Sequence, residues 1–164
     1  MDSLDLSTVF ARNCRVQRIE KPVAAVFLEK NHRLGDTGAR YRYGLFVERT
    51  TSLSETTVEP GTLVAVATFS GARKWVKSGR EIRSYEWVRY ASAPGLRVVG
   101  GMGKCLQAFI DEVHPDDVMS YADACWSEGD AYRALGFKCE GMIRKPGFEC
   151  LKFRLKLTDY NSSV

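Results

Sequence analysis

A run of glycines ahead of an amphipathic segment constrains the fold of this chain more than any other feature of its sequence. The stretch VVGGMGK places Gly100, Gly101 and Gly103 directly before a segment whose apolar residues recur at helical spacing as far as Val113. Glycine adopts backbone conformations that are closed to residues with a Cβ, and the N–H groups at the start of a helix can point together at an anion. The pattern therefore predicts a strand, a tight turn and a helix that can hold a phosphate group.

The spacing of apolar residues divides the rest of the chain into short elements. We expect strands over residues 14–20, 40–48, 63–69, 83–90, 118–122, 137–143 and 149–157, and helices over residues 22–31, 102–113 and 129–135. The first helix is expected to turn Val23, Val26 and Phe27 toward the core, and the basic segment 73–80 is expected to be an exposed loop. The strand, helix and strand around the glycines form a βαβ unit, which requires one parallel pair in an otherwise antiparallel sheet. The sequence therefore predicts an α+β domain with a mixed sheet.

Length, charge and cysteine content bound the class of protein. A chain of 164 residues suits one domain, which we expect over residues 1–164 with a disordered tail from residue 158. The formal net charge of +4 permits an anionic ligand or a DNA contact without requiring either. Five cysteines without a CxxC pair argue against a metal site and indicate a reducing, cytoplasmic location. Because no apolar run approaches the roughly 20 residues that span a bilayer, we expect no membrane partner.

Two short motifs carry a resemblance to a known family. In the first, Gly101 and Gly103 match the glycines of a motif that reads glutamine or arginine, two residues, glycine, one residue, then glycine or alanine; its first position is Val98 here. In the second, the stretch AYRALGF contains Tyr132 in a pattern like YEKLGF. The chain therefore resembles the GNAT superfamily of N-acetyltransferases, in which the first motif binds acyl-CoA.

The resemblance implies a fold, a reaction and a co-substrate. The fold is a mixed, mostly antiparallel central sheet of six to seven strands flanked by three to four helices. The reaction is the transfer of an acetyl or similar acyl group from acetyl-CoA, or another acyl-CoA, to an amine by direct attack and without a metal. The acceptor can be a small molecule, a peptide or a nucleobase, and the protein is expected to be a monomer or a homodimer. Because Val98 lacks the side chain that the motif supplies at its first position, Arg97 or Lys104 would have to replace it.

The resemblance also assigns candidate roles to individual residues. The N–H groups that would hold the CoA diphosphate belong to Val99, Gly100, Gly101, Met102, Gly103 and Lys104. Tyr132 is the candidate acid for the departing thiolate, because a phenol is protonated at neutral pH. Glu86 or Asp123 is the candidate base for the attacking amine. The candidates for the acceptor side are His32, Arg89, Trp126 and Ser127.

Each of these assignments has a structural alternative. The glycines can serve only a tight connection between strand and helix, and Tyr132 can be an aromatic packing residue. Glu86 can be a surface carboxylate or a hydrogen-bond partner in the core. A lone loop histidine such as His32 can equally be structural or exposed, and Trp126 can be a packing residue.

Several further segments narrow the resemblance to one branch. The stretches NHRLG, YEWVRY and YADACWSEGDAY are similar to a divergent branch found among phage-encoded proteins, which resembles the Mom-type enzymes that modify adenine in DNA. The alternative function is therefore a nucleic-acid-associated module of the same fold, or a Mom-like base-modification protein without ordinary acetyl transfer. Such a module would use its basic segments, Arg73 to Arg83 among them, on phosphates.

Overall fold

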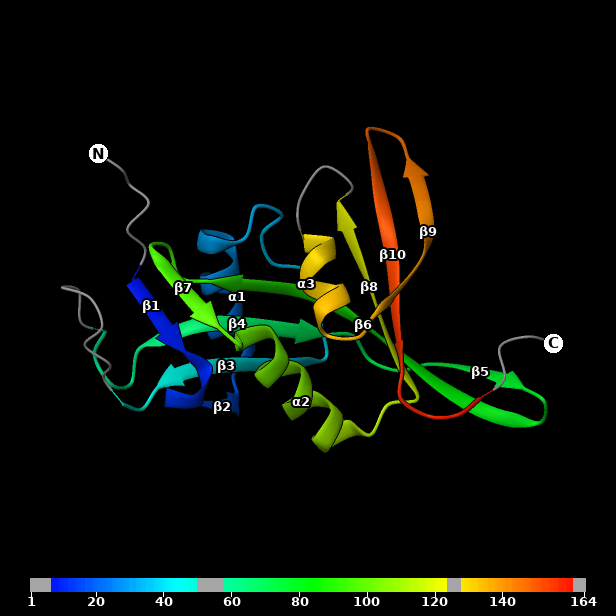
Figure 1. Ribbon diagram of the computed structural model, residues 1–164, viewed down its shortest axis with the longest axis horizontal. Coiled ribbons are helices and arrows are strands. Elements are labelled where there is room, and N and C mark those ends of the chain that lie inside the picture. Colours follow the sequence, from blue (N-terminus) through cyan, green and yellow to red (C-terminus); the bar gives the residue numbers. More distant parts are fainter. Residues whose placement is uncertain (1–6, 50–57, 124–127, 161–164) are drawn as a thin grey trace. The chain divides into compact units, whose positions relative to one another are not determined.

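The computed structural model describes residues 7–49, 58–123 and 128–160 (Figure 1). In chain order the elements are β1 (Ser7–Phe10), η1 (Ala11–Asn13), β2 (Cys14–Arg18), α1 (Lys21–Asn31), β3 (Tyr41–Val47), β4 (Leu63–Phe69), β5 (Arg73–Lys77), β6 (Arg80–Ser92), β7 (Leu96–Val99), α2 (Gly101–Val113), β8 (Asp117–Asp123), α3 (Glu128–Ala134), β9 (Lys138–Lys145) and β10 (Phe148–Lys156). The chain divides into two compact units, which we call the first unit (Met1–Phe69 with Val88–Val113) and the second unit (Ser70–Trp87 with His114–Val164). The single domain expected over residues 1–164 stays a prediction.

Hydrogen bonds between strands give a mixed sheet. The order is β2-β3-β4-β6-β8-β10-β9, with β5 paired to β6, and β1 forms a separate parallel pair with β7. β6 and β8 are parallel and are connected through α2, whereas the pairs β2–β3, β3–β4, β5–β6, β8–β10 and β9–β10 are antiparallel. The predicted α+β class, with one βαβ unit in a mostly antiparallel sheet, is confirmed.

Within the part of the chain that the structure describes, the sheet has eight strands, more than the six or seven that we expected. The prediction of an exposed loop over residues 73–80 is wrong, because Arg73–Lys77 forms β5 and pairs with β6 in a hairpin. Its turn consists of Ser78 and Gly79, which both have a positive φ, 52° and 77°. Two central residues with positive φ match the twist of the flanking strands, so this short turn joins two strands instead of ending one.

The buried face of α1 differs from the prediction. Val23 and Val26 are 44% and 70% exposed, whereas Ala24 and Leu28 are fully buried. Ala24 and Leu28 are one helical turn apart and pack against Val66 of β4, with Phe27 partly buried at the edge of this cluster. The small Ala24 side chain lets the helix backbone approach the sheet closely, and this packing advantage outweighs the larger apolar area of the two valines.

An aromatic cluster holds α2 against the first unit's strands. The ring of Phe109 stacks on that of Phe69 with centroids 4.1 Å apart and meets the rings of Tyr41 and Tyr43 edge to face. At the C-terminal end of the helix, Glu112 accepts hydrogen bonds from the Tyr43 hydroxyl at 2.6 Å and from an Arg18 guanidinium nitrogen at 2.7 Å. Because the last turns of the rigid helix are anchored in this way, the position of its first turn is determined as well.

A buried carboxylate organises the second unit. Asp117 is fully buried at the start of β8 and accepts hydrogen bonds from Ser84 of β6 at 2.9 Å and from the Tyr160 hydroxyl. Arg154 of β10 forms an ion pair with it at 2.9 Å and also donates to Glu140 of β9. The carboxylate thereby connects strands from three parts of the sequence.

The segment after β10 is packed where we expected a disordered tail. The Thr158 hydroxyl donates to Asp116 at 2.7 Å, and Tyr160 is buried with its ring edge to face with that of Trp75. The prediction of a tail beginning at residue 158 is therefore wrong for Thr158 and Tyr160. The remaining residues, 161–164, lie outside the described residues.

Replacing Asp117 should weaken the fold strongly. Asp117→Asn leaves the Arg154 guanidinium without its buried counter-charge, so we expect the free energy of unfolding to fall by about 3 to 5 kcal/mol. Asp159→Asn makes the same chemical change at an exposed position and should stay within about 0.5 kcal/mol of the parent. Urea denaturation of both variants measures the difference. Equal stability of the two variants would contradict the structural role of Asp117.

Candidate functional site

The predicted glycine turn joins β7 to the first turn of α2. Gly100 has a φ of +81°, and its carbonyl accepts the first bond of the helix, from the Lys104 N–H at 3.1 Å. The N–H groups of Gly101, Met102 and Gly103 belong to the first turn, where a helix contains no acceptor for them. They form a set of donors at the positive end of the helix dipole, which suits an anion.

At two positions of the turn, the backbone and its packing by themselves require glycine. A side chain at Gly100 would be strained by the positive φ. A Cβ at Gly101 would lie 2.4 Å from the Tyr90 hydroxyl and 2.9 Å from a methyl of Val98. The tight connection between strand and helix therefore accounts for Gly100 and Gly101 by itself.

The structure separates the two residues that were expected to replace the motif's first side chain. The Lys104 ammonium group donates to the backbone carbonyls of Ala11 and Cys14, at 2.9 and 2.5 Å, and so fastens α2 to the η1–β2 segment. Its backbone N–H donates to Gly100, so both kinds of donor on Lys104 have partners within the protein. Arg97 is exposed on β7 and remains the candidate cation for a phosphate.

Tyr132 is packed among aromatic rings. It is 8% exposed, and its ring lies edge to face with that of Trp87 and at 28° to that of Phe153, with centroids 5.7 and 5.6 Å away. Its hydroxyl lies 2.8 Å from the hydroxyl of Ser120, which donates to the Trp87 carbonyl at 3.1 Å. Because a carbonyl can only accept, the Ser120 proton belongs to that bond, and the Tyr132 proton is then directed at Ser120. This environment explains Tyr132 as a packing residue, and its role as acid stays a prediction.

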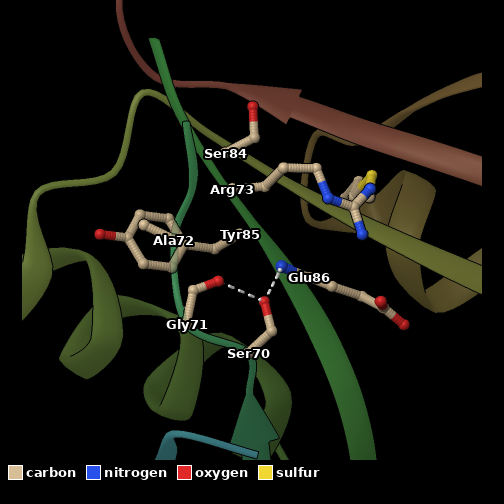
Figure 2. A pocket seen from close by; sticks show the side chains of 8 residues that line it. Ser70, Gly71, Ala72, Arg73, Ser84, Tyr85 and Glu86 are labelled. Carbon is tan, nitrogen blue, oxygen red and sulfur yellow. Dashed lines mark hydrogen bonds between the residues drawn. The ribbon is translucent and has the colours of Figure 1, made fainter. Parts of the chain in front are cut away.

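Glu86 lines a pocket of the second unit with a volume of about 320 Å³ (Figure 2). The walls come from the β4–β5 connection, the start of β5, β6 and Met119 of β8; the residues are Ser70, Gly71, Ala72, Arg73, Ser84, Tyr85, Glu86 and Met119. The Glu86 backbone is fixed on both sides, since its N–H donates to the Ser70 hydroxyl and its carbonyl accepts from the Ser70 N–H, both at 2.8 Å. The strand therefore holds the half-buried carboxylate at a defined place in the pocket wall.

Glu86 and Tyr132 lie on opposite faces of the second unit's sheet. In the parallel register of β6 and β8, Glu86 is opposite Met119. Side chains alternate along a strand, so Trp87 and Ser120, one residue further on each strand, point to the other face. Tyr132 contacts Trp87 and Ser120. The candidate base and the candidate acid are thus separated by the strands themselves.

His32 and Arg89 come together in the first unit. Arg89 donates to the Gly35 carbonyl at 2.9 Å, and the Gly35 N–H donates to the His32 carbonyl. The Nδ1 atom of His32 accepts from the Leu34 N–H at 3.0 Å. Burial, together with the positive charges of Arg89 and Arg33, lowers the pKa of His32 to about 4, so the imidazole is neutral at physiological pH. Both residues were expected on the acceptor side, and that role stays a prediction.

The other predicted site residues lie at or beyond the edge of what the structure describes. Asp123 is the last residue of β8, where its backbone pairs with Cys150. Trp126 and Ser127 lie outside the described residues. Their roles stay predictions.

Of the pocket's lining residues, sequence reasoning identified only Glu86 as a site residue; Ser70 and Arg73 are among those it missed. The alternation in RKWVK, with Trp75 between charged residues, and the Ser-Gly pair after it are the signal that could have placed Arg73 on a hairpin strand. Ser70 carries no such signal, because it acts only through the backbone of Glu86.

Two of the described thiols are poorly suited to act as nucleophiles. Cys14 and Cys105 are buried, and burial raises the pKa of both, that of Cys105 to about 12. Each is therefore a neutral thiol at physiological pH. Within residues 7–49, 58–123 and 128–160, His, Cys, Asp and Glu side chains form no group that could hold a metal ion. Among the helices described, none has the length and apolar character to cross a membrane.

Comparison with solved structures identifies the fold of the chain. No family model matches the chain, and no curated protein sequence matches it either. Solved structures do match: NAA60 of Arabidopsis thaliana in complex with acetyl-CoA has a TM-score of 0.63 at 13% identity, over 88% of this chain and 99% of that one. The chain has the fold of an acetyltransferase.

Two further structures support the same fold. A chain of the NatC complex bound to Gag peptide and CoA has a TM-score of 0.61 at 14% identity, over 89% of this chain and 99% of that one. A Bacillus subtilis acetyltransferase in complex with CoA has a TM-score of 0.60 at 13% identity, over 88% and 99%. The likeness agrees with the superfamily that the two sequence motifs indicate, and the narrower resemblance to the Mom-type branch stays a prediction.

The free energy of unfolding should depend on the protonation of His32. Its pKa is about 4 in the folded protein and about 6.5 in an unfolded chain. The folded state therefore favours the neutral imidazole, so this stabilisation is complete above about pH 6.5 and is lost as the pH falls through about 4. His32→Asn, whose amide oxygen can accept from the Leu34 N–H, should reduce proton uptake on unfolding near pH 5 by about one proton.

Urea denaturation at a series of pH values measures this dependence. The same substitution at the exposed His114 is the control for a general effect of replacing a histidine. An unchanged slope in His32→Asn would show that the histidine does not gain its low pKa from the fold.

Replacing Lys104 should affect stability, whereas replacing Arg97 should affect acetyl-CoA binding. Lys104→Gln removes a charged donor from two backbone carbonyls and should lower the free energy of unfolding by about 1 to 3 kcal/mol. Arg97→Gln should leave stability within about 0.5 kcal/mol and weaken acetyl-CoA binding about 3- to 10-fold, because an exposed cation near a phosphate contributes modestly. Denaturation and isothermal titration calorimetry measure the two effects. A destabilised Arg97→Gln beside an unaffected Lys104→Gln would reverse the assignment.

Proposed function

We propose that this protein is an acyl-CoA-dependent N-acyltransferase of the cytoplasm, which transfers an acetyl or similar acyl group to an amine. The observation that carries the proposal is the first turn of α2, whose donors follow a glycine with a positive φ in a fold shared with proteins that bind CoA. The donor set fits a diphosphate, because backbone N–H groups and a helix dipole stabilise negative charge. Gly101, Met102 and Gly103 would hold it, with Arg97 at the rim.

The proposed reaction requires two proton transfers. When bound, acetyl-CoA supplies a thioester carbonyl that an amine can attack with departure of the CoA thiolate. An ammonium acceptor loses two protons as its N–C bond forms and the C–S bond breaks, and one of them ends on sulfur while the other reaches solvent. A base on the acceptor side and an acid on the sulfur side are therefore required.

Glu86 is the proposed base. Its carboxylate lines a pocket, and its backbone is held by Ser70 on the neighbouring segment, so its position is defined before an acceptor arrives. A carboxylate at this place can bind the ammonium form of an acceptor and take the proton that frees the nitrogen lone pair. Asp123 at the end of β8 is the alternative base.

Tyr132 is the proposed acid. To act, its O–H must turn from Ser120 toward the sulfur, and the Ser120 hydroxyl can then turn from the Trp87 carbonyl to donate to the phenolate. Ser120 is a positioning residue in this scheme. Because the N–C and C–S bonds share one carbon, two groups on opposite faces of the sheet cannot both contact it, so one of Glu86 and Tyr132 would exchange its proton with the reacting atoms through water.

A nucleic-acid-associated module of the same fold is the second candidate. The β5–β6 hairpin favours it, because Arg73, Lys74 and Arg80 are exposed there within a few residues of one another. In that case the basic hairpin would contact phosphates, and the protein could be Mom-like in modifying a base without ordinary acetyl transfer. Binding and turnover of acetyl-CoA separate the two candidates.

The test is a thermal-shift titration with acetyl-CoA, free CoA and a dephosphorylated analogue, followed by turnover measurements on Tyr132→Phe. We expect a saturable rise in Tm with acetyl-CoA. Tyr132→Phe should bind acetyl-CoA as the parent does and turn over about 100- to 10,000-fold more slowly, because it loses only the acid. Tyr41→Phe removes a hydroxyl from a half-buried tyrosine of β3 and should keep the parent's turnover.

Two results would count against the proposal. The absence of any shift with acetyl-CoA would leave the nucleic-acid module as the better candidate. Parent-like turnover in Tyr132→Phe would remove the acid assignment and leave Tyr132 as a packing residue.

A further inference from the structure

The pocket around Glu86 has the size of a small-molecule site. Its volume of about 320 Å³ lies at the lower end of the range of roughly 300 to 1,000 Å³ that is usual for ligand pockets. All of its lining residues belong to the second unit. A pocket of this size holds a compact metabolite more readily than a folded macromolecular surface.

Opposite charges lie on the same face of this pocket. Arg73 is directly opposite Ser84 in the register of β5 and β6, so the two side chains share a face. Glu86 is two residues beyond Ser84 on β6 and therefore points the same way. Figure 2 shows the Arg73 and Glu86 side chains extending to the same side of the strand, with Arg73 exposed and Glu86 half-buried.

The two serine hydroxyls of the pocket are committed to the protein. The Ser70 hydroxyl accepts from the Glu86 N–H and donates to the Gly71 carbonyl, both at 2.8 Å. The Ser84 hydroxyl accepts from the Trp75 indole at 2.8 Å and donates to Asp117. The charged side chains of Arg73 and Glu86 add a cation and an anion to this lining.

We infer that the acceptor is a small amine with an anionic group close to its nitrogen, that Glu86 receives the ammonium and that Arg73 binds the anion. This inference rests on the proposed function. A guanidinium binds a carboxylate or a phosphate through paired hydrogen bonds, whereas it repels an ammonium, so the two side chains orient the acceptor in one direction. The exocyclic amine of a nucleobase carries no positive charge for Glu86, and a simple alkylamine offers nothing to Arg73.

The reaction is that of the proposed function. The acceptor nitrogen gives one proton to Glu86, forms the N–C bond to the acyl carbon as the C–S bond breaks, and loses a second proton; one of the two protons ends on the CoA sulfur and the other in solvent. Arg73 takes no part in these bond changes and acts only by holding the anionic group. Its loss should therefore affect acceptors with an anion and spare those without one.

The experiment compares matched acceptors with acetyl-CoA as donor. One pair is β-alanine and β-alaninamide, and the other is 2-aminoethyl phosphate and ethylamine. We expect kcat/KM for the anionic member to exceed that for its neutral match about 10-fold or more in at least one pair. The preferred pair distinguishes a carboxylate from a phosphate as the recognised group.

Two variants assign the preference to Arg73. Arg73→Gln should lower kcat/KM for the anionic acceptor about 10- to 100-fold and leave the neutral acceptor unchanged. Lys74→Gln removes a neighbouring charge whose side chain alternates to the other face of β5, and it should leave both acceptors unchanged. Calorimetric titration of the parent and Arg73→Gln with β-alanine and 2-aminoethyl phosphate, without acetyl-CoA, should show the same loss in binding.

The outcomes separate this inference from the proposed function. Acetyl transfer without preference for an anionic acceptor, transfer only to neutral or macromolecular amines, or an equal effect of Arg73→Gln on both members of a pair would overturn the inference and leave the acyltransferase intact. Absence of both acetyl-CoA binding and transfer to every acceptor would overturn the two together. A drop in Tm of Arg73→Gln that accompanies equal losses on both acceptors would assign Arg73 to the fold and overturn the inference as well.

Discussion

The buried Asp117 carboxylate is the interaction on which the second unit depends. A charge that is removed from water is costly unless ion pairs and hydrogen bonds replace its hydration, and Asp117 meets Ser84, Arg154 and Tyr160. Its position at the first residue pair between β6 and β8 places this network next to the pocket that contains Glu86. The polar network thus sets the register of the two strands from which the candidate base is presented.

The α2 turn shows how one glycine run can meet two demands. Gly100 and Gly101 are needed because the chain must change direction with a positive φ and pass close to Tyr90. The same turn leaves the N–H groups of the first helical residues pointing away from the helix, where they can bind an anion. A tight connection and an anion site are therefore compatible explanations, and Lys104 strengthens the first by tying the helix to two backbone carbonyls.

Strand alternation puts the candidate base and the candidate acid on different faces of the sheet. Glu86 and Trp87 are consecutive residues of β6, so one faces the pocket and the other supports Tyr132. Since the bond that forms and the bond that breaks share one carbon, only one of the two side chains can contact the reacting atoms directly. The alternation also explains why Tyr132 is surrounded by aromatic rings while Glu86 has the cation of Arg73 on its own face.

Local sequence patterns were enough to predict much of the fold. The helix expected over 102–113 is α2, and the strand expected over 63–69 is β4, because apolar periodicity, glycine and proline act over a few residues. The α+β class followed from the order of these elements. The basic strand β5 was missed because its alternation is carried mainly by charged residues, and the pattern predicted for α1 failed because Ala24 could pack more closely than its larger neighbours.

The features of the candidate site can likewise be separated into those set by local sequence and those set by tertiary structure. The sequence by itself determined the glycine turn, the motif tyrosine and the candidate carboxylate Glu86, since each depends on residue type and spacing. Only the tertiary structure decided that Lys104 is engaged with carbonyls far away in the chain, that Tyr132 lies on the other face from Glu86, and that Arg73 lines the Glu86 pocket. Those outcomes depend on which distant segments contact one another. These contacts are set by the packing of the whole sheet rather than by any local pattern.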